Sequence, residues 1–196
     1  MASINYARRE ITCKVVYYGC AMCGKTTNLE YIHTHIPASE KGGLVSLSTQ
    51  GDRTLFFDFL PLEAHNVGGF TVKFQLYTVP GQVVYNATRR LVLRGVDGLV
   101  FVADSQWSRV KENMESFGNL LENMAQYGYD IDMMPCVIQH NKRDLPDIAP
   151  VHYLDFTLNR RPRRAPTCES VAPQGAGVFD SLNAVCRLVL AKLRQA

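Results

Sequence analysis

The stretch Gly19-Cys20-Ala21-Met22-Cys23-Gly24-Lys25-Thr26 has the spacing G-x-x-x-x-G-K-T, the pattern of a phosphate-binding loop. It follows residues 11–18, a run rich in Val, Ile and Tyr that predicts a buried strand. Residues 27–35 after it are expected to continue as a helix. This strand–loop–helix context argues against a chance match in a glycine turn. By itself the loop indicates only a nucleoside triphosphate.

Each position in the loop has a mechanical reason. Glycine at 19 and 24 lets the backbone turn so that successive N–H groups point inward at phosphate oxygens. The N-terminus of the following helix adds its positive dipole end at the same point. Lys25 is expected to reach the β- and γ-phosphates, and the Thr26 hydroxyl to ligate Mg²⁺. The predicted nucleotide contacts of the loop are Gly19, Ala21, Cys23, Gly24, Lys25, Thr26 and Thr27.

Length and composition indicate a globular protein. The 196 residues predict a single domain, 1–196, with 46% hydrophobic and 20% charged residues. A net charge of +3 is too small to argue for nucleic acid or a membrane surface as partner. No apolar run approaches the roughly 20 residues that cross a bilayer, and charged residues occupy the place of a signal peptide's apolar segment. We therefore expect a cytoplasmic protein with no integral membrane segment.

The cysteines lie mostly in apolar contexts, which predicts buried, reduced thiols. They are Cys13, Cys20, Cys23, Cys136, Cys168 and Cys186. Cys20 and Cys23 form a C-x-x-C, but both belong to the phosphate loop. Zinc would need a second pair at comparable spacing, and the chain has none. Redox sensitivity stays as the minor alternative, because a thiol near a helix N-terminus can have a lowered pKa.

The part of the chain after the first helix predicts a long connection and then two strands. Residues 36–53 are polar and glycine-bearing, and long ordered loops in compact domains are usually functional. Residues 55–61 predict a strand that ends at Pro61, and 70–77 predict a second strand. The short glycine turn between them makes the pair antiparallel. Thr78-Val79-Pro80-Gly81-Gln82 and a polar, helix-prone segment to residue 94 follow.

The second half of the chain alternates between strands and helices. Continuous apolar runs at 98–103 and 135–139 predict fully buried strands, and 167–170 predicts a short one. Residues 108–127 predict an amphipathic helix, and 178–193 a final helix. The expected buried face of the first of these helices carries Val110, Met114, Phe117, Leu121 and Met124.

This alternation predicts an α/β protein of three layers. We expect a mostly parallel six-stranded sheet with one antiparallel edge strand and helices on both faces. Ligands of such sheets bind at the carboxyl ends of the strands, where the motifs of this chain fall.

Asn141-Lys142-x-Asp144 is the second strong motif. Guanine presents N1–H and a 2-amino group, and one carboxylate can accept both, whereas adenine offers no such pair. A site built on such polar groups can reject the analogue that lacks them by as much as ~10⁴-fold. Asn141 is expected to bond the base edge and the phosphate loop, while the Lys142 stem covers a ring face. A backbone N–H of Val171 or Ala172 is predicted to meet guanine O6.

Arg160-Arg161-Pro162-Arg163-Arg164 is the one charge cluster. An acidic partner or a phosphate surface is conceivable there. Because prolines lie in and beside the cluster, a solvated loop between a helix and a strand is the favoured interpretation.

Taken together, these motifs resemble the Ras-like small GTPases, and among them the bacterial MglA gliding-motility and cell-polarity GTPases. The resemblance covers nearly the whole chain. Its carriers are YYG…GKTTN, RTLFFDFLP, YTVPGQ, RGVDG, VFVADS, NKRD and GVF. It implies a Mg²⁺-dependent switch between GTP and GDP that hydrolyses GTP.

The resemblance also implies roles for single residues. Thr54 would contact Mg²⁺ and the γ-phosphate, Gln82 would orient the attacking water, and Arg53 would act as an arginine finger in cis. Gly81, in YTVPGQ, belongs with the nucleotide contacts. A Roadblock-type, MglB-like activating partner would stimulate a slow hydrolysis. Downstream polarity or motility effectors, a monomeric state without the partner, and recruitment to a cell pole are implied as well.

Two positions depart from the family pattern. Ala21 replaces the usual glycine, and its methyl group can crowd the catalytic glutamine or arginine. Thr78 replaces the usual aspartate, so another acid is expected near Mg²⁺. Asp58, alone in an apolar strand, is the first choice, and Asp52 the second. A solvent-facing Asp58 is the competing interpretation.

Two other classes of function stay open. One is a regulatory module that holds GTP or GDP with little turnover, which Ala21 favours. The other is a P-loop kinase for a small molecule, for which the sequence shows neither acceptor site nor lid.

Overall fold

Both faces of strand β2 (Glu10–Tyr18) are covered by helices, and the rest of the protein is arranged around it. The computed structural model of the protein describes residues 2–46 and 58–195. Cys13, Val15 and Tyr17 of β2 belong to one core cluster, and Val16 and Tyr18 belong to another. This double burial is why the strand reads as a nearly continuous apolar run.

Eight strands form one sheet in the described part of the chain, in the order β3-β4-β5-β2-β6-β7-β8, and β1 pairs with the start of β2, ahead of the residues that pair with β6. Strands β2, β5, β6, β7 and β8 are parallel, and β1, β3 and β4 are antiparallel to their neighbours. The remaining strands are β1 (Ser3–Asn5), β3 (Val45–Ser46), β4 (Asp58–Val67), β5 (Phe70–Thr78), β6 (Gly98–Asp104), β7 (Cys136–Asn141) and β8 (Thr167–Glu169). The predicted fold class is confirmed, and β1 and β3 are two short strands beyond the six expected.

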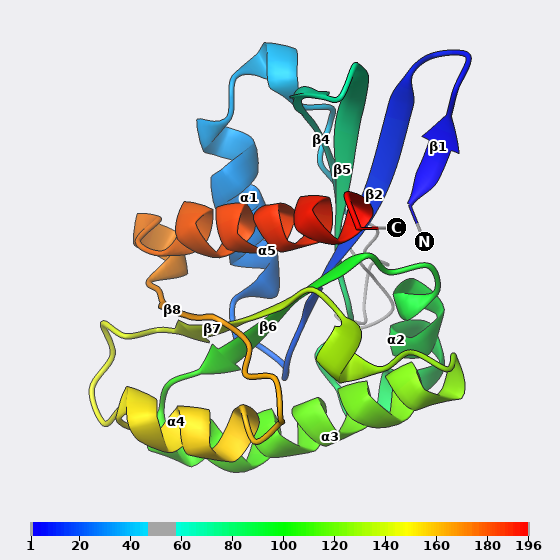
Figure 1. Ribbon diagram of the computed structural model, residues 1–196. Helices are drawn as coiled ribbons and strands as arrows, with labels where there is room; N and C mark the ends of the chain where they lie inside the picture. The colour runs from blue at the N-terminus through cyan, green and yellow to red at the C-terminus, as the bar shows by residue number, and fades with distance from the viewer. Residues whose placement is uncertain (1, 47–57, 196) are drawn as a thin grey trace.

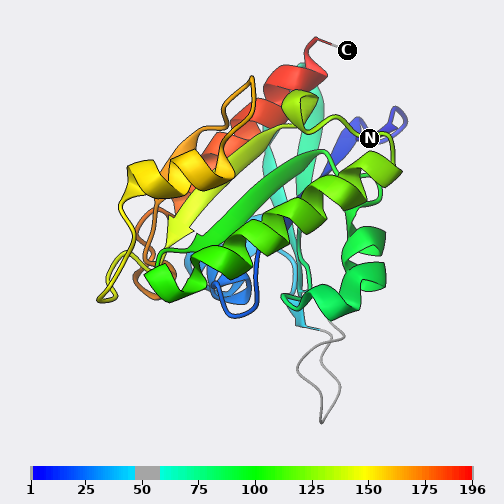
Figure 2. The same cartoon turned by 90° about the horizontal axis from the view of Figure 1, so that it is seen from below.

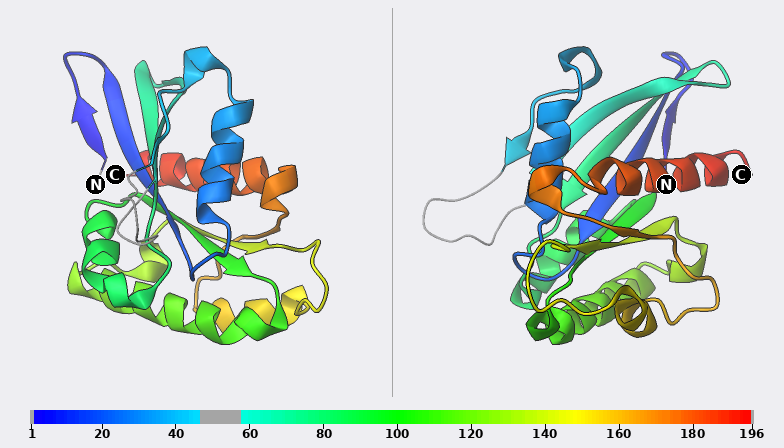
Figure 3. Two further views of the ribbon diagram at one scale, coloured as in Figure 1. Left: turned by 180° about the vertical axis from the view of Figure 1, so that it is seen from behind. Right: turned by 90° about the vertical axis from the view of Figure 1, so that its left-hand side faces the viewer.

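Helices cover the sheet on both sides, as Figures 1 and 3 show. Helices α1 (Lys25–His35) and α5 (Val178–Leu193) lie on one face. Helices α2 (Asn86–Leu93), α3 (Val110–Gln126) and α4 (Val151–Leu158) lie on the other, with α3 between its two neighbours (Figure 2). Single 3₁₀ turns are η1 (Ala38–Glu40), η2 (Val83–Tyr85), η3 (Trp107–Arg109), η4 (Ile131–Met133) and η5 (Ala172–Gln174). The predicted final helix is found at its predicted bounds.

Pro61 does not end its strand, and that prediction was wrong. Strand β4 runs through Pro61, which pairs with Gln75 of β5. The Pro61 carbonyl accepts a hydrogen bond from the Gly42 N–H, so this residue's polar groups face away from β5. The N–H that proline lacks would point to the same outer side, and no bond to β5 is lost.

The inner face of α3 differs from the predicted one. Met114 is 49% exposed and Leu121 is 37% exposed, whereas Asn113, Asn119 and Asn123 are buried. The buried face is rotated about the helix axis relative to the predicted face, because these amides find hydrogen-bond partners inside the protein. Hydrophobic spacing alone cannot reveal such a face.

These amides join α3 to α2 and to the end of β2. The Tyr18 hydroxyl donates to Asn119 Oδ1 at 2.8 Å, and Asn123 Nδ2 donates to Asn86 Oδ1 at 2.7 Å. Arg89 of α2 is fully buried, donates to Ser116 Oγ at 2.7 Å and lies 4.3 Å from the centre of the Tyr18 ring. Burial lowers the pKa of Arg89 from its ordinary value.

The parallel strands deliver the sequence motifs to one edge. Strands β2, β5, β6 and β7 end at Tyr18, Thr78, Asp104 and Asn141. Because β2 lies between β5 and β6, the phosphate loop starts where the sheet order reverses, the usual ligand position in such sheets. The candidate site is therefore this carboxyl edge.

Candidate functional site: a phosphate loop joined to an N-K-x-D segment

The phosphate loop connects β2 to α1, and its backbone requires glycine at two positions. Gly19 has φ 151° and Gly24 has φ 103°. A Cβ on Gly19 would collide with the Val102 carbonyl, and one on Gly24 would collide with the Asn141 amide. Helix α1 begins at Lys25, two residues before the predicted start. The loop thus lies directly against the ends of β6 and β7.

Lys25 is almost fully buried, at 6% exposure, inside the loop. Its Nζ donates to the carbonyls of Cys20 at 2.6 Å and Gly19 at 3.2 Å, and it lies 3.6 Å from Cys23 Sγ. Within the described residues this cation is held by two carbonyl dipoles and the Cys23 sulfur, contacts that it can exchange for anionic oxygens.

Asn141 connects three segments of the site. Its Nδ2 donates to the Cys23 carbonyl at 2.8 Å, and its Oδ1 accepts from Ser170 Oγ and from the Ala172 N–H, both at 3.0 Å. The side chain is buried, so these bonds are shielded from water. Asn141 therefore fixes the end of β7 against both the phosphate loop and the segment after β8.

A second layer of amides supports this connection. Gln139 Nε2 donates to Asn28 Oδ1 at 2.9 Å, and Asn28 Nδ2 donates to the Gly24 carbonyl at 2.8 Å. The sequence analysis did not predict these supporting roles of Gln139 and Asn28, nor that of Ser170 beside Asn141. Asn28 stands in the quoted GKTTN and Ser170 in the segment after β8, but nothing in the sequence marks Gln139.

Lys142 forms an ion pair with a buried carboxylate. Its Nζ lies 2.6 Å from Asp104 Oδ2, and the Asp104 side chain is only 1% exposed. Arg109 Nε lies 3.9 Å from the same oxygen, and Gln106 N–H donates to the other. Asp104 belongs to the quoted VFVADS, but its role as the anchor of Lys142 was not predicted.

The other residues predicted to read the base lie beside this pair. Asp144 is exposed, two residues beyond Lys142. The Val171 N–H donates to the Ala176 carbonyl and the Ala172 N–H to Asn141 Oδ1, so both N–H groups have partners within the protein. Their contact with guanine O6 stays a prediction.

The segment after β5 closes on the phosphate loop. Thr78 is buried at the end of β5, opposite Tyr17 of β2. A Cβ on Gly81 would collide with Ala21 Cα and lie 2.7 Å from its nitrogen, so glycine permits this approach. Gln82 follows, exposed, at the start of η2. Gly81 and Ala21 are therefore brought together, and Gln82 is not fixed by either.

Several predictions fall outside the described residues or beyond what these can test. Arg53, Thr54 and Asp52 lie outside the described residues. Asp58 is the first residue of β4. Thr26 is exposed and Thr27 is half-buried in the first turn of α1.

No group of three or more His, Cys, Asp or Glu side chains arranged to hold a metal ion occurs among residues 2–46 and 58–195. Mg²⁺ is commonly held by one or two side-chain oxygens together with substrate phosphates. Thr26 is an exposed residue beside the loop, and its hydroxyl is an oxygen ligand of the kind that such a site uses.

Comparison with known proteins identifies the family to which the chain belongs. No protein-family model matches it. It is 56% identical over 195 residues to the mutual gliding-motility protein MglA of Myxococcus xanthus (strain DK1622), an alignment that covers all of this chain and 99% of that protein. The chain belongs to the MglA family of small GTPases. The family expected from the sequence motifs is confirmed.

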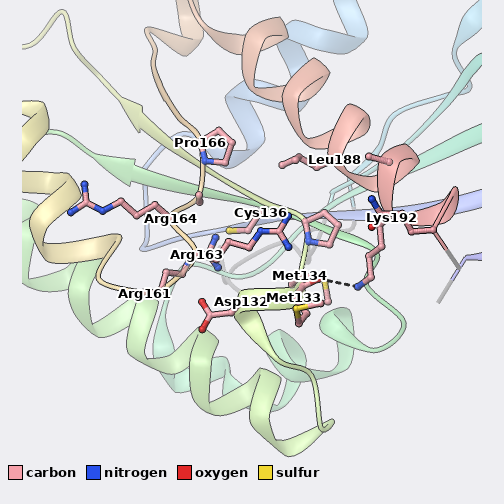
Figure 4. Close-up of a pocket in the computed structure, with 14 residues that line it drawn as sticks. Asp132, Met133, Met134, Cys136, Arg161, Arg163, Arg164, Pro166, Leu188 and Lys192 are labelled. Atoms are coloured by element: carbon pink, nitrogen blue, oxygen red, sulfur yellow. Dashed lines mark hydrogen bonds between the residues drawn. The ribbon is translucent and has the colours of Figure 1, made fainter.

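A cavity of about 140 Å³ in this MglA-family protein lies away from the site, at the amino ends of β7 and β8 (Figure 4). Arg161 in its wall donates to the Ile131 carbonyl at 2.8 Å, while Arg163 and Arg164 are exposed. Figure 4 shows the Arg164 side chain extending away from Cys136. The basic cluster is thus a mostly solvated loop, as predicted, with Arg161 turned inward.

No helix among the described residues of this MglA-family protein has the length and apolar character to span a membrane.

Proposed function

We propose that this MglA-family protein is a GTP-binding switch that hydrolyses GTP to GDP and phosphate. In this proposal its nucleotide state controls partner binding in cell polarity or gliding motility. The observation that supports it most is the Asn141 bridge, which holds the N-K-x-D segment against the phosphate loop. A nucleotide with its phosphates in the loop would then place its base beside Asp144, whose carboxylate suits the guanine N1–H and 2-amino donors.

The chain's own residues would bind the phosphates. Lys25 would give up the Gly19 and Cys20 carbonyls for β- and γ-phosphate oxygens, and loop N–H groups would add further donors. Mg²⁺, when bound, neutralises charge that develops on the phosphate oxygens. Thr26 and Thr54 would hold it.

Hydrolysis would depend on Gln82 and Arg53. Gln82 would orient the attacking water, and Arg53 would stabilise the transition state in cis. Because Gln82 is exposed, contacts beyond those described in the chain must fix it. This favours slow turnover alone and stimulation by a Roadblock-type, MglB-like partner that orders the catalytic groups.

A regulatory module with little turnover is the second candidate. The close approach of Gly81 to Ala21 favours it, since the Ala21 methyl group adds bulk where the catalytic groups must converge. Both candidates bind guanine nucleotides, and only hydrolysis separates them.

Single-turnover hydrolysis of GTP, with and without the Roadblock-type partner, distinguishes the two candidates. We expect turnover that the partner stimulates. Gln82→Leu and Arg53→Ala should each reduce it by orders of magnitude, since removing an arginine finger costs ~10³–10⁵ in rate. Nucleotide affinity should change little, because both residues act on the transition state. Absence of turnover in every condition would favour the module, and stimulated turnover that survives Arg53→Ala would make that arginine structural.

The cellular setting is part of the same proposal. We expect a cytoplasmic monomer, in the absence of its partner, that is recruited to a cell pole and read there by polarity or motility effectors. The small net charge of +3 supports the exclusion of nucleic acid as partner.

A further inference from the structure

Cys20 and Cys23 are the second and fifth residues of the phosphate loop, and both are buried. The chain turns between them at Ala21 and Met22, and Met22 has φ 61°. The first and fourth residues of such a turn have Cα atoms less than about 7 Å apart, within the reach of a disulfide. Each of the two side chains changes the pKa of the other. Both are free cysteines.

The surroundings of the pair favour a thiolate on Cys23. Lys25 Nζ lies 3.6 Å from Cys23 Sγ, and the Cys20 thiol donates to Asn113 Oδ1 at 3.3 Å. Burial opposes ionisation of Cys23, but the neighbouring Cys20 side chain and the Lys25 charge outweigh it and lower the pKa of Cys23 to about 6. A lowered pKa and a neighbouring thiol are the features of redox-active C-x-x-C pairs.

The described structure contains a second pair of neighbouring cysteines for comparison. Cys13 is buried in the core between the sheet and α5, and the half-buried Cys186 packs against that core; burial raises the pKa of each to about 12. Burial is the largest cause of the pKa shift at each of these two cysteines. Cys13 and Cys186 are therefore inert, although they interact electrostatically.

We propose that Cys20 and Cys23 form a reversible disulfide within the phosphate loop when the protein meets a peroxide. The Cys23 sulfur attacks one peroxide oxygen, the O–O bond breaks, and the leaving hydroxide takes up a proton to become water. Cys20, after losing its proton, attacks the sulfenic sulfur of Cys23 and displaces its hydroxyl as a second water. Two thiols lose two electrons and two protons in total, and the peroxide gains them. Cys20 and Cys23 are 3% and 0% exposed, and Met22, which lies between them in the chain, is 81% exposed.

The disulfide would change nucleotide binding, an effect that rests on the proposed function. It fixes residues 20–23 in the turn whose Cys20 carbonyl accepts from Lys25. Phosphate binding needs the N–H groups of this same segment to converge on the ligand. The loss of one charge-assisted N–H bond corresponds to about tenfold or more in affinity. The oxidised loop should therefore bind GTP and GDP at least about tenfold more weakly.

Peptide mass spectrometry and nucleotide titration of the full-length protein test this inference. Trypsin releases residues 15–25, which contain Cys20 and Cys23 and no other cysteine. After hydrogen peroxide treatment, this peptide should be two hydrogens lighter and resist alkylation, and GDP affinity should fall. Dithiothreitol should reverse both changes. Cys20→Ser should abolish the lighter peptide and the peroxide-dependent change in affinity, each compared with its own untreated state.

Cys186→Ser is the matched control, and its peroxide response should equal that of the unmodified chain. A peptide that stays fully alkylated after peroxide treatment would overturn the inference, as would a disulfide that leaves affinity unchanged. The mass measurement involves no nucleotide. If the reduced protein bound no GTP, the proposed function would fail while the disulfide result would stand.

Discussion

The two ends of the site differ in how their polar groups are held. At the Asn141 end, buried polar groups are bonded to one another; this end comprises Asn141, Ser170, Ala172 and the Lys142–Asp104 pair. Asn141 alone makes three hydrogen bonds, one to the phosphate loop and two to the segment after β8. At the Gln82 end, which comprises Ala21, Gly81 and Gln82, the backbones of Ala21 and Gly81 touch and the Gln82 side chain is exposed.

This difference separates two tasks. A bonded, buried network holds one geometry whether or not a ligand is present, as selection of a base requires. An exposed side chain beside a close backbone contact has to be placed before it can assist a reaction, and a partner can supply that placement. We infer that nucleotide specificity is built into the Asn141 end, while turnover at the Gln82 end is open to regulation.

Lys25→Ala should produce the largest effect, because Lys25 belongs to the loop that both ends share. Removing one partner of a buried charge contact costs about 2–5 kcal/mol, or roughly 30- to 5,000-fold in affinity. We expect GTP and GDP affinity to fall within that range, measured by titration with a fluorescent analogue. Lys111→Ala, at a lysine whose side chain is 87% exposed on α3, is the control and should change nothing. Unchanged binding by Lys25→Ala would remove the loop from the site.

The thermal stabilities of Asn141→Ala and Gln82→Ala compare the two ends of the site directly. Without Asn141, the Ala172 N–H and the Cys23 carbonyl lose their bonds to its side chain, which costs roughly 2–4 kcal/mol of unfolding free energy. At about 2–4 °C per kcal/mol this lowers Tm by about 4–16 °C. Gln82→Ala removes an exposed side chain and should stay within about 0.5 kcal/mol. Thermal unfolding of nucleotide-free protein measures both, and equal Tm values for the two variants would contradict the difference between the ends.

Much of this architecture follows from local patterns in the sequence. The apolar runs of β6 and β7 predicted those strands, because burial of a whole strand requires such residues. The phosphate loop and the N-K-x-D segment were found because their chemistry fixes both residue type and spacing. Strands β1 and β3, only three and two residues long, are too short to leave such a pattern.

The remaining features depend on which distant positions meet. The inner face of α3 carries amides because Tyr18 and Asn86 lie opposite, and Pro61 fits within β4 because its missing N–H faces outward. Gln139 donates a hydrogen bond to Asn28, which lies 111 positions away in the chain. None of these partners can be read from local sequence. The roles of Arg53 and Thr54 come from the family resemblance and stay predictions.

We infer that Asp144 is the group that selects guanine at the Asn141 end of the site. The most direct measurement is the affinity of the full-length protein and of Asp144→Asn for GDP, ADP and xanthosine diphosphate, by competition against one fluorescent guanine nucleotide. Xanthine has a carbonyl where guanine has its 2-amino group, so an amide at 144 can donate where the carboxylate accepted. We predict that the unmodified chain prefers GDP to ADP by up to ~10⁴-fold, the range for a site built on such polar groups. Asp144→Asn should bind GDP more weakly and xanthosine diphosphate more tightly. Equal affinity of the unmodified chain for ADP and GDP would contradict the account.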